Sequence, residues 1–262
     1  MRKSSIQKGS SLAIAAVFIA CIVLLIAGGV LLKLFLVLRA SGFDGVHQYI
    51  VEIDESKTRG EILAFSPSTQ SINVLRVKGK VDTTFGAYLK VPVDALVVMP
   101  LVKSPLQVIG NMLWHAKDEK GITFIDKIRL FLFANSLKPT DFHETSIKLP
   151  IDPVAADTVL PSLFLDNVLY ADNETITVVN ATGQPGIAAD AAKMLTTIGM
   201  DVVSITTADA TQHTTTIVAN TLGSYTVNRL GRIFRVTPIK GHGSVVSDIT
   251  LTIGKDSLSQ LQ

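Results

Sequence analysis

The chain has 262 residues and a formal net charge of +2 at pH 7. So small a net charge argues against nucleic-acid binding, and we expect no nucleic-acid partner. Hydrophobic residues make up 47% of the chain, which is enough for a buried core in addition to an apolar segment. The single cysteine, Cys21, lies within the longest apolar run, so no disulfide and no thiol nucleophile is expected elsewhere.

A transmembrane helix is predicted for residues 11–38. No charged side chain occurs from residue 11 to 32, and at about 1.5 Å rise per residue this run spans about 33 Å. A cleavable signal peptide is the alternative, since it also begins with basic residues and an apolar run. Its apolar core is only about 7 to 15 residues long, so we expect an uncleaved single-pass anchor.

Basic residues at both ends of this run bear on its orientation. Those that precede it are Arg2, Lys3 and Lys8. Lys and Arg beside a span favour the cytoplasmic side, so residues 1–10 are expected in the cytoplasm and the later domains outside the cell membrane. Lys33 and Arg39 at the far end oppose this orientation.

Residues 43–150 are predicted to form a mixed α/β domain. Strands are expected at residues 49–53, 62–66, 72–77 and 91–99. The second and third should form a hairpin around the turn at residues 67–70. Helices are expected at residues 106–116 and 124–137.

Residues 151–174 are predicted to be a linker. Three prolines lie in or beside this segment: Pro150, Pro153 and Pro161. Such spacing favours an extended linker or a segment that lies across the neighbouring domain, and it marks the best domain boundary in the sequence.

Residues 175–256 show clean periodic patterns. Strands are expected at residues 176–179, 201–207, 214–219, 234–238 and 249–253, and helices at 187–198 and 225–232. Gly199 lies just past the first helix, where a left-handed C-cap is usual. The whole chain is therefore expected to be α/β (α+β), with a transmembrane helix, a mixed middle domain and a small C-terminal sandwich module that contains a β-α-β unit.

Several ordered landmarks in this module belong together: Val178-Val-Asn180-Ala-Thr182, Gly186-Ile-Ala188, Gly199-Met-Asp-Val202, Thr216-Ile217 and Asp248-Ile-Thr-Leu-Thr-Ile-Gly254-Lys-Asp256. On these residues the module resembles the C-terminal domain of the LytR-CpsA-Psr family of cell-envelope proteins. The resemblance implies a function in the cell envelope.

In complete members of that family, an upstream domain resembles a phosphotransferase that moves glycopolymers from a polyprenyl-pyrophosphate lipid to the cell wall. The segments similar to it here are residues 61–67, 72–77 and 90–98. Its Arg-Asp pair would fall at Gly79-Lys80, and of its Arg-x-Asp motif only Arg59 and Glu61 remain. Pyrophosphate transfer needs cations at defined positions and carboxylates for Mg²⁺, so these departures from the family's motifs imply a degenerate, non-catalytic middle domain.

A basic segment is the first candidate binding site. Arg76, Lys78 and Lys80 alternate, so on a continuing strand they project from one face and could contact phosphate groups. The alternative is a solvated edge strand that carries cations as protection against aggregation.

The loop that precedes the first helix of the C-terminal module is the second candidate. Its candidate binding residues are Asn180, Thr182, Gly183 and Gly186. A loop that leads from a strand into a helix N-terminus suits anions, but a turn that needs glycine freedom explains the sequence as well.

The sequence contains no pattern typical of a metal-binding site or of a hydrolytic active site. The five histidines, at positions 47, 115, 143, 213 and 242, have no ligand spacing, and no serine has a nucleophile-elbow context. We therefore expect no metal, no cofactor and no catalytic residue. Residues 124–133 are apolar with interspersed cations, and are expected to pack on the sheet or to lie on a membrane surface as an interfacial helix.

Together these observations predict a single-pass, membrane-anchored, extracytoplasmic protein. Its expected role is non-catalytic binding or scaffolding in cell-wall assembly or maintenance. The expected partners are the membrane and peptidoglycan, a wall glycopolymer or anionic lipid, while the oligomeric state stays open. The alternative is a phosphotransferase that attaches glycopolymers from a polyprenyl-pyrophosphate carrier by means of Arg59, Glu61 and the cations of residues 76–80.

Overall fold

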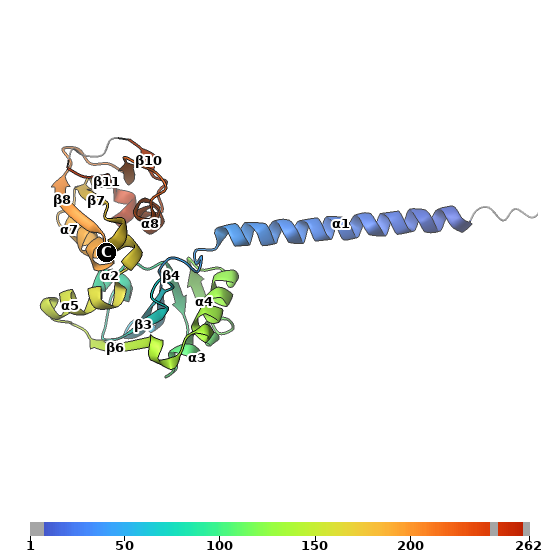
Figure 1. The fold of residues 1–262 in the computed structure, drawn as a ribbon, viewed down its shortest axis with the longest axis horizontal. Coiled ribbons are helices and arrows are strands. Elements are labelled where there is room, and N and C mark those ends of the chain that lie inside the picture. The colour runs from blue at the N-terminus through green and yellow to red at the C-terminus, as the bar shows by residue number, and fades with distance from the viewer. Residues whose placement is uncertain (1–7, 242–245, 259–262) are drawn as a thin grey trace, which may run out of the picture. The chain divides into compact units, whose positions relative to one another are not determined.

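A computed structural model describes residues 8–241 and 246–258 of the chain (Figure 1). It divides into two units, Met1–Ser41 and Gly42–Gln262. The first unit holds α1 (Lys8–Ala40), within which Ile14–Lys33 is long and apolar enough to cross a membrane. The predicted apolar helix is confirmed, while most of the predicted cytoplasmic segment lies outside the described residues.

The second unit, called here the globular unit, begins with a six-stranded sheet in the order β5-β4-β1-β2-β3-β6. Its strands are β1 (Tyr49–Ser56), β2 (Arg59–Ser66), β3 (Ser71–Lys78), β4 (Ala95–Val98), β5 (Asp118–Lys120) and β6 (Phe142–Lys148). The pairs β1/β2, β2/β3 and β4/β5 are antiparallel, whereas β1/β4 and β3/β6 are parallel. The predicted hairpin of β2 and β3 is confirmed, with residues 67–70 as its turn.

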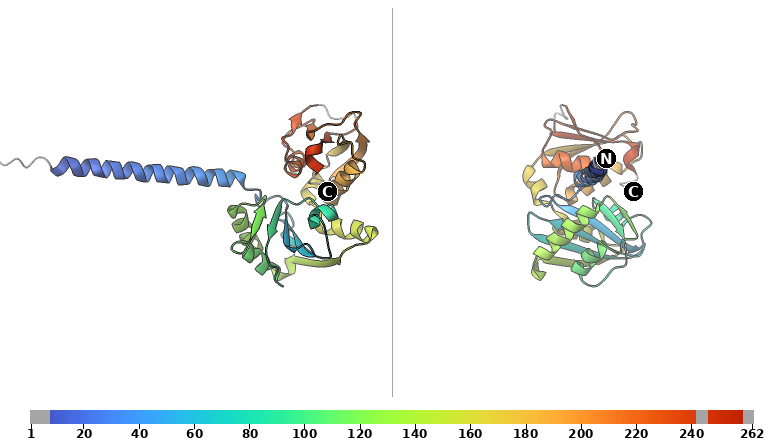
Figure 2. Two further views of the ribbon diagram at one scale, coloured as in Figure 1. Left: turned by 180° about the vertical axis from the view of Figure 1, so that it is seen from behind. Right: turned by 90° about the vertical axis from the view of Figure 1, so that its right-hand side faces the viewer.

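Helices cover both faces of this sheet (Figure 2). They are α2 (Phe85–Leu89), α3 (Pro105–Met112), α4 (Phe124–Ser136) and α5 (Pro153–Phe164). The short η1 (Pro139–Asp141) has no buried residue and leads from α4 into β6. The face that carries Ile53 and Leu63 packs against α3 and α4. The face that carries Ile62 and Leu75 packs against α2 and α5, and its core continues into the C-terminal part of the chain.

The C-terminal part forms a five-stranded sheet in the order β10-β9-β11-β7-β8. Its elements are β7 (Thr175–Asn180), α7 (Ile187–Thr197), β8 (Asp201–Thr207), β9 (Thr216–Ala219), α8 (Tyr225–Phe234), β10 (Ile239–Lys240), β11 (Ile249–Ile253) and η2 (Lys255–Ser257). β7 and β8 are parallel and α7 joins them, which confirms the β-α-β unit. Gly199 has φ +98°, the left-handed geometry expected of a helix C-cap.

The extended conformation predicted for residues 151–174 is wrong, because this segment forms α5 and α6 (Asn167–Asp172). The alternative, a segment that lies across the neighbouring domain, agrees with the packing of α5 on the core of the sheet. Asp152 caps α5 by accepting a hydrogen bond from the N–H of Ala155, and Pro153 occupies the first turn, where its missing N–H costs nothing. Leu160 and Phe164, four residues apart, are buried on one side of the helix. The helical spacing of apolar residues was therefore a better guide to the conformation of this segment than its proline content.

Three further boundaries differ from the sequence prediction. The strand predicted at residues 91–99 is confined to β4, and the helix predicted at residues 106–116 ends at Met112. The strand predicted at residues 234–238 is wrong: Phe234 ends α8, and Arg235 follows as a cap with φ +55°. A residue in that conformation ends the helix without starting a strand.

Candidate functional sites

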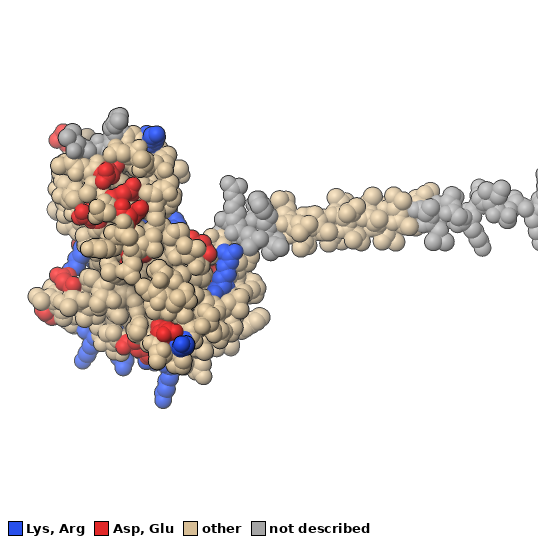
Figure 3. All heavy atoms as spheres, viewed as in Figure 1, with Lys and Arg blue, Asp and Glu red and all other residues tan. Residues whose placement is uncertain are grey.

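A small basic hollow lies on the sheet face that α3 and α4 cover. β2 and β3 pair Arg59 with Lys78 and Glu61 with Arg76, so these four side chains project from the same face. They line a hollow of about 190 Å³ together with Ser146 and the loop at residues 101–103. Figure 3 shows Lys and Arg side chains projecting from the edge of the unit near β6.

Arg76 is the centre of this basic hollow, and protein atoms occupy each of its three nitrogens. Its Nε donates to Oε1 of Glu61 at 2.9 Å and its Nη1 pairs with Oε2 of Glu144 at 2.8 Å. Its Nη2 donates to the carbonyl oxygen of Lys103 at 2.5 Å. Burial raises the pKa of Glu61, although the charge of Arg76 acts in the opposite direction. The guanidinium therefore holds three parts of the sheet together.

The structure brings only part of the predicted basic segment together. β3 ends at Lys78, and Gly79 follows with φ +135°, so the exposed Lys80 lies beyond the strand and does not line the hollow. The prediction that all three cations share one face is wrong for Lys80. The alternative of an edge strand is wrong as well, because β3 lies between β2 and β6.

The loop before α7 is held together by its own side chains. Oδ1 of Asn180 accepts hydrogen bonds from the N–H and the hydroxyl of Thr182, at 3.0 and 2.7 Å. Nδ2 of Asn180 donates to the carbonyl oxygen of Gln184 at 2.7 Å. Gly183 and Gly186 have φ values of +79° and +87°, which glycine adopts most readily. These contacts account for the four residues through the turn itself, and ligand binding there stays a prediction.

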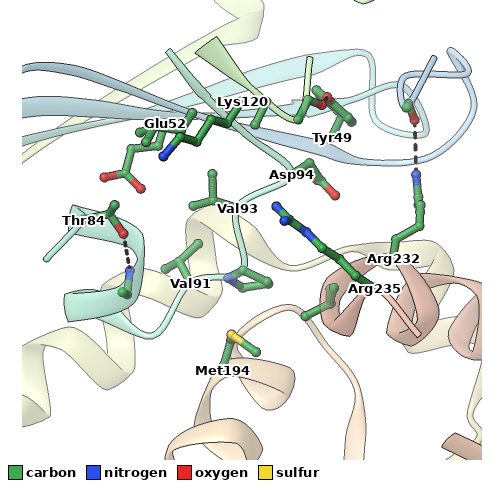
Figure 4. A pocket seen from close by; sticks show the side chains of 17 residues that line it. Tyr49, Glu52, Thr84, Val91, Val93, Asp94, Lys120, Met194, Arg232 and Arg235 are labelled. Carbon is green, nitrogen blue, oxygen red and sulfur yellow. Dashed lines mark hydrogen bonds between the residues drawn. The ribbon is translucent and has the colours of Figure 1, made fainter. Parts of the chain in front are cut away.

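A larger cavity of about 390 Å³ lies between the second face of the six-stranded sheet and the C-terminal part (Figure 4). Lys120 points into it from the sheet side, and Arg235 points into it from the end of α8. Its apolar walls come from Val91, Val93 and Met194. A cavity with two converging cations and apolar walls suits an anionic group attached to an apolar or sugar-like body.

Glu52 is the buried acid of this larger cavity, and the sequence prediction missed it. Its two carboxylate oxygens accept hydrogen bonds from the N–H groups of Phe85, at 2.5 Å, and Gly86, at 3.0 Å. Burial, with a further contribution from the nearby carboxylate of Asp54, raises the pKa of Glu52 to about 8. Burial also raises the pKa of Asp54, to about 6. The available signal was an acid inside the otherwise apolar run at residues 49–53.

A buried ion pair joins the two sheets of the globular unit. Arg229 of α8 is completely buried, and its Nη1 pairs with Oδ1 of Asp94 just before β4. Oδ2 of the same Asp94 accepts a hydrogen bond from the N–H of Ile50 at 2.8 Å. A second ion pair links Lys90 to Asp190 of α7 at 2.9 Å. The walls of the larger cavity are therefore tied to each other on two sides.

Over the part of the chain that the structure describes, no group of three or more His, Cys, Asp or Glu side chains is arranged to hold a metal ion. His242 lies outside this part. His47 makes structural contacts: its ring stacks on Tyr225 with 4.1 Å between the centroids, and its Nδ1 contacts Oδ2 of Asp44 at 2.5 Å.

These features define an α/β protein with an N-terminal helix that fits a membrane span and a globular unit built from two mixed sheets. Residues 173–256 match the family model LytR_C, described as LytR cell envelope-related transcriptional attenuator. The chain therefore carries a C-terminal LytR-type domain, which confirms the predicted resemblance of the C-terminal module and indicates a cell-envelope-related protein. No curated protein and no solved structure gives a significant match.

Proposed function

We propose that this chain is a membrane-anchored, extracytoplasmic protein that binds a wall polymer without chemically altering it. The observation that carries the proposal is the LytR-type domain at residues 173–256 in a chain that also holds a membrane-length apolar helix. Wall polymers and their lipid carriers lie at the outer leaflet, so an anchor replaces a three-dimensional search by a local one.

The state of Arg76 supports the non-catalytic part of this proposal. A cation that assists pyrophosphate transfer must be able to take up charge that develops on the phosphate oxygens. The nitrogens of Arg76 are already occupied by Glu61, Glu144 and the Lys103 carbonyl. To release Arg76 toward a ligand would leave the buried carboxylate of Glu61 unpaired, which is costly.

The larger cavity supports the binding part. Lys120 and Arg235 converge from opposite walls. Among the described residues that line the cavity, the acids are Glu52 and Asp94, and Asp94 already pairs with Arg229. Burial raises the pKa of Glu52 to about 8, which favours the neutral, protonated form of this acid. The cavity is then cationic, and it fits a phosphate or carboxylate of a wall polymer.

The test is retention of the full chain, in detergent micelles, on isolated peptidoglycan that keeps its attached glycopolymer. We expect retention of the natural chain, and several-fold weaker retention of the double variant Lys120→Ser with Arg235→Ser. The matched control is Lys240→Ser, an exposed cation that does not line the cavity. Failure of the natural chain to be retained would contradict the proposed function.

One observation favours the alternative, a phosphotransferase. Arg59, Glu61, Arg76 and Lys78 do converge on one hollow, as an active site would require. The alternative is tested by incubating the full chain with a polyprenyl-pyrophosphate-linked glycan, peptidoglycan and Mg²⁺. We expect no transfer beyond that of the Arg76→Met variant, and transfer that depends on Arg76 would overturn the non-catalytic proposal.

A further inference from the structure

Helix α4 carries an exposed apolar face on the side that does not pack against the sheet. Asp126, Leu130 and Ala134 are buried on its inner side. The outer side presents Phe124, Ile128 and Leu132, which are 51%, 37% and 61% exposed. A spacing of four residues places these three side chains in one row along the helix.

Trp114, the only tryptophan of the chain, lies next to this row and is 77% exposed. It lines a hollow of about 280 Å³ that also includes Lys127 of α4. Nζ of Lys127 in turn lies 5.8 Å from the centre of the Phe124 ring. Trp114, Phe124, Ile128 and Leu132 are called the apolar stripe below. Exposed aromatic and aliphatic residues grouped in this way mark an interaction surface.

Helix α4 also binds Phe43, which lies three residues after the end of α1. The N–H of Phe43 donates to Oδ1 of Asp126 at 2.9 Å, and Nη1 of Arg129 donates to the carbonyl oxygen of Phe43 at 2.9 Å. The ring of Phe43 is buried and meets the ring of Phe133 edge-on, with 6.0 Å between centroids. α4 therefore clamps Phe43 through both backbone polar groups and its ring.

Chain connectivity then limits what the apolar stripe can reach. The membrane-length segment ends at Lys33 and α1 ends at Ala40, three residues before Phe43. Seven helical residues rise about 10 Å and three residues extend over about 11 Å at most, so Phe43 lies within about 21 Å of the end of the span. If α1 crosses a bilayer, covalent geometry alone keeps the clamped start of the globular unit, and with it α4, close to the membrane surface. This constraint does not depend on how the two units are oriented.

The charges around the apolar stripe complement an anionic surface. Residues 101–140 contain six Lys or Arg and three Asp or Glu, although the whole chain has a net charge of only +2. Three of these nine charges do not face solvent beside the stripe: Asp126 is buried and bonded to Phe43, Lys127 is buried and paired with Glu119, and Lys120 points into the larger cavity. Four cations and two acids remain in this segment. Amphipathic helices that lie in a membrane interface combine Trp, Phe and Leu on one face with flanking cations.

We propose that the apolar stripe of α4 and Trp114 docks into the headgroup region of the bilayer that holds α1, and prefers anionic lipid. The inference rests on the membrane anchor of the proposed function. Docking of the stripe gives the globular unit a second attachment to the membrane and so restricts its rotation about the short connection to α1. The larger cavity would then face the wall in a limited set of orientations.

The experiment uses the full chain reconstituted into vesicles with about one third phosphatidylglycerol, in which part of the lipid carries bromine on its acyl chains near the headgroup. Trp114 is the only tryptophan reporter. We expect blue-shifted emission and strong quenching by the brominated lipid. The double variant Ile128→Glu with Leu132→Glu, and the milder Phe124→Ser, should each lower the quenching several-fold.

The control is Val154→Glu, which places one carboxylate on an apolar residue of α5 that is 73% exposed, and it should leave the quenching unchanged. An alkaline wash of the vesicles separates the two proposals. A chain that stays in the vesicles with unquenched Trp114 overturns docking and leaves the anchor intact, whereas a chain that is washed off overturns the anchor. Emission that depends on the protein-to-lipid ratio and not on bromine would identify a second copy of the chain as the partner, and would also overturn docking.

Discussion

The two faces of the six-stranded sheet use buried charge in different ways. On the face under α3 and α4, Arg76 is balanced by Glu61 and Glu144 from the neighbouring strands β2 and β6. On the opposite face, Asp94 is balanced by Arg229, which lies 135 positions away in the C-terminal part. The first arrangement stabilises one sheet, and the second couples two sheets. Loss of the second pair should therefore destabilise the whole globular unit.

The largest effect is expected from Arg229→Met. It leaves the carboxylate of Asp94 in the interface without its cation, and loss of one partner of a buried ion pair costs about 3–5 kcal/mol of the free energy of unfolding. Urea unfolding followed by circular dichroism measures the change. The control is Lys193→Met, which breaks an exposed pair with Asp157 and should cost less than about 0.5 kcal/mol.

The proposed role of the Asp94–Arg229 pair would be contradicted if Arg229→Met and Lys193→Met lowered the free energy of unfolding by the same amount. A second variant sharpens this test: Asp94→Asn added to Arg229→Met removes the unpaired charge while it keeps an oxygen for the N–H of Ile50. We expect this double variant to recover part of the lost stability.

Glu52 predicts a pH dependence for the second face. Folding raises its pKa from 4.5 to about 8, so the folded chain holds this proton over a pH range in which the unfolded chain has lost it. The stabilisation is complete below about pH 4.5 and is lost as the pH rises toward 8. One group contributes a slope of up to about 1.4 kcal/mol per pH unit. Between pH 5 and 8 the free energy of unfolding should therefore fall less steeply with pH for Glu52→Gln than for the natural chain. Equal slopes for the two proteins would contradict the raised pKa of Glu52.

The first face should respond more weakly than the second to loss of its cation. Arg76→Met leaves Glu61 and Glu144 without their shared partner, and we expect a loss of about 1–3 kcal/mol, because the Arg76 side chain is 28% exposed and water can relieve part of the charge. Lys80→Met, which removes an exposed cation beyond the end of β3, is the control and should change stability little. A loss from Arg76→Met that exceeds that from Arg229→Met would reverse the comparison.

The features of the fold that the sequence predicted correctly are those that depend on interactions between neighbouring residues. The charge-free run in α1, the apolar spacing of α7 and the left-handed position of Gly199 can all be recognised from neighbouring residues. The same holds for the landmarks of the LytR-type domain, which lie in ordered positions between residues 173 and 256. Periodicity and turn chemistry act over a few residues, so these features could be predicted.

The tertiary structure decided where charge is buried and what covers it. No local pattern shows that Arg229 meets Asp94, that Glu52 is shielded by α2, or that Arg76 gains a third partner in the loop at Lys103. The helices at residues 153–164 and 167–172 replaced a predicted linker because Leu160 and Phe164 found a core contributed by both sheets. Burial depends on contacts between residues far apart in the chain, and these contacts set the free-energy cost of each charge and helix.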